Sequence, residues 1–117
     1  MSADTSAVLG VVERHLAAVR HGDADAMAAD YAADATLQRG TTTYRGSSEI
    51  RGYFTGVPDR LQGGRVAFDQ PVVSGAEVTF TWRIVGGPAD GRGGEDRCVV
   101  ADGEIVSQTV TLHDQDF

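Results

Sequence analysis

The chain has 117 residues, of which 41% are hydrophobic and 23% charged, and its net charge is −7 at pH 7. This length fits one domain over residues 1–117, and the composition excludes extended disorder. The negative charge argues against nucleic acid and anionic membranes as partners. Cys98 is the single cysteine, which excludes an intramolecular disulfide and a thiolate metal cluster.

The beginning of the chain carries neither a basic region nor an apolar run, so we expect no signal peptide. No apolar stretch approaches the roughly 20 residues that a membrane span needs. We therefore expect a cytoplasmic protein that does not associate with membranes.

The first third of the chain is predicted to be helical. Apolar residues recur at helical spacing over residues 5–20, which indicates an amphipathic helix with His15 in its apolar stripe. A shorter helix is predicted over residues 24–32, with Asp23 as its N-cap and Tyr31 in its last turn.

The middle of the chain changes period twice. Residues 35–45 are predicted to form a hairpin that turns at Gly40. A third helix follows, capped by Ser47 or Ser48 and ended by Pro58.

The rest of the chain is strand-like. The predicted strands are residues 65–73, 77–85, 95–101 and 104–113. The glycine-rich stretch 86–94 lacks a GK[ST] motif and precedes a strand, so we expect a hairpin tip rather than a phosphate loop. Helices followed by antiparallel strands indicate an α+β fold, with a pocket between a bent sheet and the helices.

Strand alternation places polar residues on apolar faces. Asp96 shares its face with Cys98, and Arg39 shares its face with Leu37. With His15, they form a set that should meet each other, water or a ligand, because a buried lone charge costs several kcal/mol. The set is either a catalytic cluster at a pocket floor, or a structural His–Asp pair with Arg39 reaching solvent.

Further residues are candidates for shaping the pocket and contacting a substrate. They are Tyr31, Tyr53, Phe80, Trp82 and Gln108. Tyr and Trp combine an apolar body with a polar group, and a buried amide without a partner is costly. In the last strand we expect Val106 and Val110 to face inward with Gln108. The histidines show no metal-ligand spacing, so we expect neither a metal nor another cofactor.

Three segments resemble the bacterial ketosteroid isomerases. They are VVERHLAA (11–18), YAADATL (31–37) and GSSEIR (46–51). That family belongs to the nuclear-transport-factor-2-like (NTF2-like) superfamily, with the SnoaL-like polyketide cyclases and the limonene-epoxide hydrolases. The resemblance implies a cone-shaped, curved mixed β-sheet wrapped around three N-terminal helices. It also implies an internal apolar cavity and a homodimer.

The same resemblance places His15, Arg39 and Asp96 at the active positions of the family. Asp96 matches the oxyanion-hole Asp, whereas His15 replaces the oxyanion-hole Tyr and Arg39 replaces the general-base Asp. Because a guanidinium cannot accept a proton, standard ketosteroid isomerisation is not expected. Gly94, two residues before Asp96, departs from the Arg-x-Asp motif of the limonene-epoxide hydrolases.

We therefore predict a small cofactor-independent enzyme that resembles steroid delta-isomerase. It would use acid/base catalysis through an enolate on a hydrophobic small molecule that is steroid-, terpenoid- or polyketide-like. The alternatives are a SnoaL-like cyclase or epoxide-opening enzyme of secondary metabolism, or a catalytically silent domain for ligand binding or association.

The expected roles leave one question open. His15 would be the general acid/base because its usual pKa is near neutrality, and Arg39 would stabilise an enolate or bind a carboxylate. Asp96 would either orient His15 or donate to an oxyanion. Burial favours its protonated form, whereas Arg39 nearby favours its ionised form.

Overall fold

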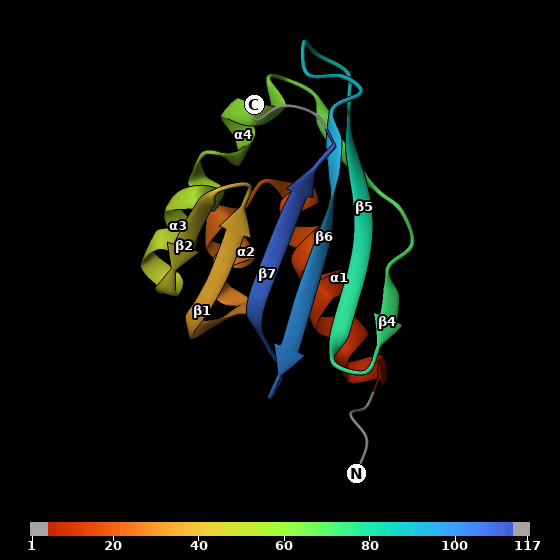
Figure 1. The fold of residues 1–117 in the computed structure, drawn as a ribbon. Coiled ribbons are helices and arrows are strands. Elements are labelled where there is room, and N and C mark those ends of the chain that lie inside the picture. The colour runs from red at the N-terminus through yellow and green to blue at the C-terminus, as the bar shows by residue number, and fades with distance from the viewer. Residues whose placement is uncertain (1–4, 114–117) are drawn as a thin grey trace.

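The computed structural model describes residues 5–113, which form four helices and seven strands (Figure 1). The helices are α1 (Thr5–His21), α2 (Ala24–Ala29), α3 (Gly46–Thr55) and α4 (Val57–Leu61). The strands are β1 (Tyr31–Arg39), β2 (Thr42–Arg45), β3 (Arg65–Phe68), β4 (Val72–Ser74), β5 (Glu77–Val85), β6 (Gly93–Ala101) and β7 (Glu104–Leu112). Within residues 5–113, no helix is both long and apolar enough to cross a membrane.

The strands form one mixed, curved sheet with the helices on its inner face (Figure 1). Its order is β2-β1-β7-β6-β5-β3, and β4 also pairs with β5. Strands β1 and β7 are parallel, and the other pairs are antiparallel. The predicted α+β fold with a curved mixed sheet is confirmed. The described residues contain four helices, whereas three were predicted.

The second helix is shorter than predicted, because Tyr31 begins a strand instead of ending a helix. The backbone N–H of Ile105 donates to the carbonyl of Asp30 at 2.8 Å, and Tyr31 pairs with Ile105 in parallel register. This pairing with β7 overrides the helix propensity of the alanines that follow Tyr31.

The third helix begins and ends at other residues than predicted. Its N-cap is Arg45, whose N–H donates to Oε1 of Glu49 at 2.9 Å, so neither serine is the cap. Pro58 lies in the first turn of α4, where its missing N–H breaks no helical hydrogen bond. Helix α4 brings Arg60 to the edge of the inner space, a position that the sequence analysis missed.

Two strand predictions also need correction. The predicted strand 65–73 is divided into β3, which ends at Phe68, and β4, which begins directly after Pro71. Proline has no N–H to donate to a ladder. A bulge after Val99 shifts the register between β6 and β7. Ile105 therefore takes the fully buried position, while Val106 is only partly buried.

The core lies between the helices and the inner face of the sheet. The apolar residues with no exposed surface are Val12, Met27, Ala35, Leu37, Ile50, Val78, Cys98 and Ile105. Alternation predicted the inward side for Leu37, Val78 and Cys98, and this is confirmed. The same parity carries polar residues of β1, β6 and β7 into the interior.

Candidate active site

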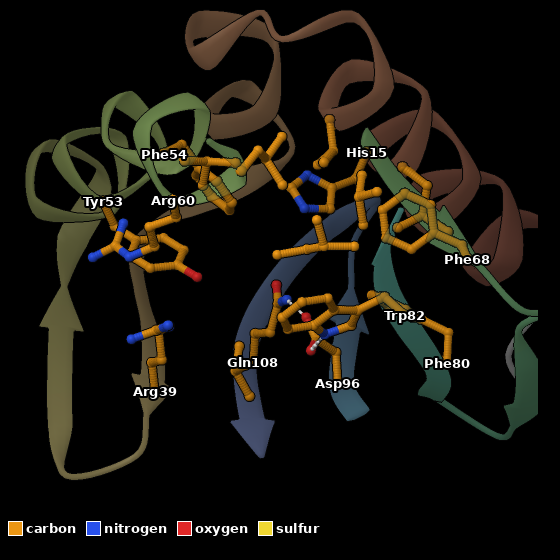
Figure 2. A pocket seen from close by; sticks show the side chains of 17 residues that line it. His15, Arg39, Tyr53, Phe54, Arg60, Phe68, Phe80, Trp82, Asp96 and Gln108 are labelled. Carbon is orange, nitrogen blue, oxygen red and sulfur yellow. Dashed lines mark hydrogen bonds between the residues drawn. The ribbon is translucent and has the colours of Figure 1, made fainter. Parts of the chain in front are cut away.

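A mostly apolar cavity lies between the helices and the sheet (Figure 2). The space open to the centres of water molecules is about 80 Å³. One water needs roughly 10–15 Å³ on this measure, so the cavity holds several waters or one small organic molecule.

Most of the residues predicted for the site line this cavity. They are His15, Arg39, Tyr53, Phe80, Trp82, Asp96 and Gln108. Four of them are polar and nearly inaccessible, with exposed fractions of 2% for His15, 6% for Arg39, 6% for Asp96 and 4% for Gln108. Tyr31 is not among the lining residues and contacts the site from within the core.

Asp96 lies in the cavity wall with both carboxyl oxygens engaged. The indole N–H of Trp82 donates to Oδ1 at 2.8 Å, and the amide of Gln108 donates to Oδ2 at 2.5 Å. The register explains this convergence, because Asp96 pairs with Phe80 in β5 and with Val110 in β7. Trp82 lies two residues after Phe80 and Gln108 lies two residues before Val110, so both share a face with Asp96.

Burial raises the pKa of Asp96 from its usual 3.8 to about 7. The hydrogen bonds from Trp82 and Gln108 and the charge of Arg39 act in the opposite direction but do not overcome burial. Asp96 therefore gains and loses a proton near neutral pH. A carboxyl group with this pKa can take a proton from a bound molecule and return it.

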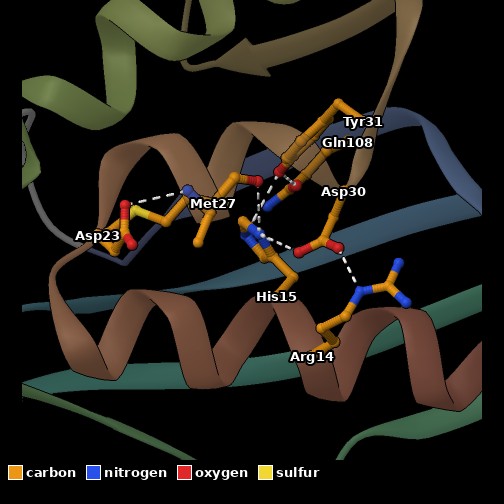
Figure 3. A network of polar contacts seen from close by, with 8 residues as sticks. Arg14, His15, Asp23, Met27, Asp30, Tyr31 and Gln108 are labelled. Atoms are coloured by element: carbon orange, nitrogen blue, oxygen red, sulfur yellow. Dashed lines mark hydrogen bonds and ion pairs between the residues drawn. The ribbon is translucent and has the colours of Figure 1, made fainter.

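His15 also lines the cavity, but its nearest acidic side chain is Asp30. Its Nδ1 lies 3.2 Å from the carbonyl oxygen of Met27 and 3.9 Å from Oδ2 of Asp30 (Figure 3). Its Nε2 lies 3.4 Å from the hydroxyl of Tyr31. The site therefore orients His15 through groups that the sequence analysis did not assign to it.

His15 is connected to Asp96 indirectly, through two side chains. The hydroxyl of Tyr31 donates to Oε1 of Gln108, and the amide of Gln108 donates to Asp96. Hydrogen bonds thus connect Tyr31 to the carboxyl group of Asp96 through Gln108, and the Tyr31 oxygen lies 3.4 Å from Nε2 of His15. The predicted His15–Asp96 pairing is replaced by this arrangement.

Burial lowers the pKa of His15 from 6.5 to about 4, although the negative charge of Asp30 acts to raise it. Aromatic rings exclude water from the imidazole, including that of Phe54, whose centroid is 5.2 Å from the imidazole centroid. His15 is therefore neutral at pH 7. The prediction that His15 titrates near neutrality is wrong, and the group that does so is Asp96.

Asp30 connects this network to the surface and was not predicted from the sequence. Its Oδ1 accepts from Nε of Arg14 at 2.5 Å, and the Arg14 side chain is 62% exposed. Among the described residues, its Oδ2 has no hydrogen-bond donor, and His15 Nδ1 is 3.9 Å from it. Asp30 lies in an alanine-rich segment that was predicted to be helical, so the sequence did not indicate its buried position.

The wall that contains Arg39 carries hydrogen-bond donors. Burial raises the pKa of Tyr53 to about 12, so its hydroxyl is protonated, and Figure 2 shows it directed toward the interior of the site. Arg60 stacks on the same ring, with its guanidinium carbon 5.0 Å from the ring centroid. Proton transfer at Asp96 and stabilisation of negative charge by Arg39 and Tyr53 are the chemistry that this set can perform.

Metal-ligating side chains are not clustered in the described part of the chain. Within residues 5–113, no group of three or more His, Cys, Asp or Glu side chains is arranged to hold a metal ion.

Gly94 leaves room for the indole of Trp82. A Cβ atom at Gly94 would lie 3.1 Å from Cζ2 of Trp82 and 2.6 Å from the backbone oxygen of Thr111. We expect Gly94→Ala to destabilise the fold by about 1–3 kcal/mol, because this space is already filled. It should also change the fluorescence of Trp82.

Urea unfolding and the emission spectrum test this expectation. Gly10→Ala is the matched control, because a Cβ atom at Gly10 in α1 would meet no atom within 4 Å. That control should be neutral or stabilising. Unchanged stability and emission of Gly94→Ala would contradict the close packing of Trp82.

Comparisons with known proteins agree with this architecture. The model of the SnoaL-like domain matches residues 12–108. An NTF2-like protein of unknown function from Mesorhizobium loti superposes with a TM-score of 0.84 at 16% identity, covering 97% of this chain and 98% of that chain. No curated protein matches the chain significantly.

Two further solved structures are similar in fold and carry functional descriptions of their own. A candidate isomerase of the SnoaL-like family from Agrobacterium tumefaciens has a TM-score of 0.76 at 19% identity, covering 93% of this chain and 99% of that chain. A candidate polyketide cyclase from Sinorhizobium meliloti has a TM-score of 0.75 at 16% identity, covering 87% and 94%. Since the family model spans most of the sequence, the chain belongs to the SnoaL-like domain family.

Proposed function

We propose that this protein is an acid/base enzyme that forms an enolate from a small hydrophobic carbonyl compound, with isomerisation as its overall reaction. The observation that carries the proposal is Asp96, a buried carboxyl group with a pKa of about 7 in the wall of an apolar cavity. A base with this pKa is well matched to proton transfer at neutral pH.

The reaction would proceed in two proton transfers. The carboxylate of Asp96 takes a proton from the carbon next to the substrate carbonyl, and the electrons of that C–H bond form a C=C bond. The carbonyl oxygen becomes an enolate oxygen, to which Tyr53 donates a hydrogen bond and whose negative charge the nearby positive charge of Arg39 stabilises. Where the substrate has a C=C bond next to the deprotonated carbon, the enolate is conjugated with it as a dienolate. Asp96 then returns a proton to the far carbon of that C=C bond, which yields the isomer and restores the Asp96 carboxylate.

This assignment exchanges two roles relative to the ketosteroid isomerases that the sequence resembles. Asp96, at the position of the oxyanion-hole acid, would be the base. Arg39, at the position of the base, would stabilise the oxyanion. His15 would remain neutral and lie against Tyr31, while Tyr31 holds Gln108 and Gln108 holds Asp96 by hydrogen bonds.

The size of the cavity favours a substrate smaller than a four-ring steroid. A cyclase is the second candidate, supported by the structural similarity to a candidate polyketide cyclase. In that reaction the same enolate carbon would attack a second carbonyl carbon of the same molecule. Both candidates share the first step, so one assay tests them together.

Deuterium exchange tests this first step without knowledge of the natural substrate. Phenylacetone, an enolisable ketone, is incubated with the protein in D2O, and loss of its α-protons is followed by NMR. We expect exchange well above the rate in buffer alone. Exchange at the buffer rate for phenylacetone and for a panel of similar small ketones would contradict enolisation and favour a catalytically silent binding domain.

Tyr53→Phe should lower the exchange rate by about 100-fold, since one donor to the enolate oxygen is removed. The remaining ring still packs on Arg60 and on Tyr44, whose ring centroid is 5.0 Å away. The matched control is Tyr44→Phe, because Tyr44 is not among the residues that line the cavity. Equal rates for the two variants would exclude Tyr53 from the oxyanion site.

A further inference from the structure

Two arginines lie in the wall of a cavity that is otherwise mostly apolar. The whole chain has a net charge of −7, yet Arg39 and Arg60 both line this space. Asp96 is the only carboxyl group among the described lining residues. The lining therefore carries more positive than negative charge, which attracts an anion.

The two guanidinium groups act on the same part of the cavity. Arg39 comes from the end of β1 and Arg60 from α4, and Figure 2 shows both on the side where Tyr53 lies. Burial raises the pKa of the Tyr53 hydroxyl, and the positive charges of both arginines oppose this effect. One hydroxyl thus lies within the electrostatic reach of both guanidiniums.

The other walls suit the body of an apolar molecule. Phe68 and Phe80 stack edge to face with centroids 5.7 Å apart, and both line the cavity with Trp82 and Phe54. Phe68 and Phe80 lie across the cavity from the arginines, whereas Phe54 lies beside Tyr53 (Figure 2). A ligand that satisfies both regions has an apolar body and an anionic group at one end.

We propose that Arg39 and Arg60 form a carboxylate-binding subsite, and that the substrate is a small hydrophobic carboxylic acid. The planar guanidinium matches a carboxylate through two parallel N–H···O bonds. The small cavity leaves space for a body of about one aromatic ring. This inference rests on the proposed function for the identity of the molecule as a substrate.

A pair of isosteric probes tests the subsite without any turnover. The probes are 3-phenylpropanoate and the neutral 3-phenylpropanamide, and the signal is the fluorescence of Trp82, the only tryptophan of the chain. We expect the carboxylate to bind about 10- to 100-fold more tightly than the amide, as hydrogen bonds between charged groups require. Isothermal titration calorimetry checks the affinities.

Single substitutions then test which side chains cause the preference for the carboxylate over the amide. Arg39→Met and Arg60→Met should each reduce it about tenfold, whereas Arg83→Met should leave it unchanged, because Arg83 is 59% exposed and does not line the cavity. Circular dichroism confirms that each variant is folded. Because the two arginines are replaced in separate variants, one variant still tests the subsite if the other does not fold.

Several outcomes would overturn the subsite. They are equal affinities for the two probes, no binding of the carboxylate at millimolar concentration, and a preference that survives both replacements. Asp96→Asn separates this proposal from the proposed function, because it should retain the preference for the carboxylate while losing proton exchange. Exchange of phenylacetone with no carboxylate preference would leave the enolising enzyme intact and reject the subsite alone.

Discussion

Replacing Asp96 with Asn is expected to lower the rate of α-proton exchange by about 100- to 10,000-fold, the usual contribution of a general base. Asparagine has nearly the same shape as aspartate but cannot accept the proton. Its Oδ1 can still accept from Trp82, and its amide can donate to Gln108 once the Gln108 amide turns over. The loss should therefore be in rate rather than in folding.

Asp102→Asn is the matched control for this substitution. Asp102 is exposed in the turn between β6 and β7 with φ of 53°, a conformation that Asn also adopts readily. Its exchange rate should equal that of the unmodified protein. If Asp96→Asn also retained the full rate, corrected for its folded fraction, Asp96 could not be the base.

The inward positions of Arg39, Asp96 and Gln108 could be predicted from the sequence because strand alternation depends on the local chain alone. Each lies an even number of residues from an apolar neighbour on the same strand. The helical stripe identified His15 by the same kind of local argument. The residues whose inward position follows from strand alternation or helical spacing could therefore be identified from the sequence.

The partners of these residues depend on contacts between distant segments, which no local period encodes. Tyr31 joins the hydrogen-bonded chain because β1 begins early, paired with β7. Asp30 approaches His15 because α2 ends one residue before it. Arg60 reaches the cavity because Pro58 starts a helix that the sequence analysis read as an end.

The protonation states could not be predicted for the same reason. His15 has a usual pKa close to neutrality, and Asp96 has one far below it. Burial moves the two values past each other, to about 4 and about 7. The extent of burial follows from the packing of the whole fold. The residue type alone therefore led to the prediction that His15, and not Asp96, titrates near neutral pH.

The raised pKa of Asp96 should make the stability of the protein depend on pH. Burial raises the pKa of Asp96 from 3.8 to about 7, so the folded state holds a proton that the unfolded state releases. That stabilisation is complete below about pH 4 and is lost as the pH rises to about 7. The difference corresponds to about 4 kcal/mol, at roughly 1.4 kcal/mol per pH unit.

His15 has the opposite effect over nearly the same range. Its pKa falls from 6.5 to about 4 on burial, so the unfolded state binds a proton that the folded state excludes. Its contribution is complete above about pH 6.5 and is lost as the pH falls to about 4, a change of about 3 kcal/mol. Between pH 4 and 6.5 the two residues change the free energy of unfolding in opposite directions, and their effects cancel. In this range the folded state and the unfolded state each hold one proton on this pair of residues.

Each single substitution should therefore remove the contribution of one residue to the pH dependence of stability and leave that of the other. The free energy of unfolding of Asp96→Asn, relative to the unmodified protein, should increase by about 4 kcal/mol between pH 4 and pH 8. For His15→Phe, the relative free energy should instead increase as the pH falls from 6.5 to 4. Urea unfolding followed by circular dichroism at each pH measures both, with Asp102→Asn as the control.

The outcome bears directly on the proposed chemistry. A constant difference between Asp96→Asn and the unmodified protein across this range would mean that Asp96 titrates as it does in the unfolded chain. The carboxyl group would then be a weaker base than the proposed mechanism assumes. A slope confined to pH 4–7 and absent in Asp102→Asn would place the raised pKa at Asp96, the residue proposed as the base.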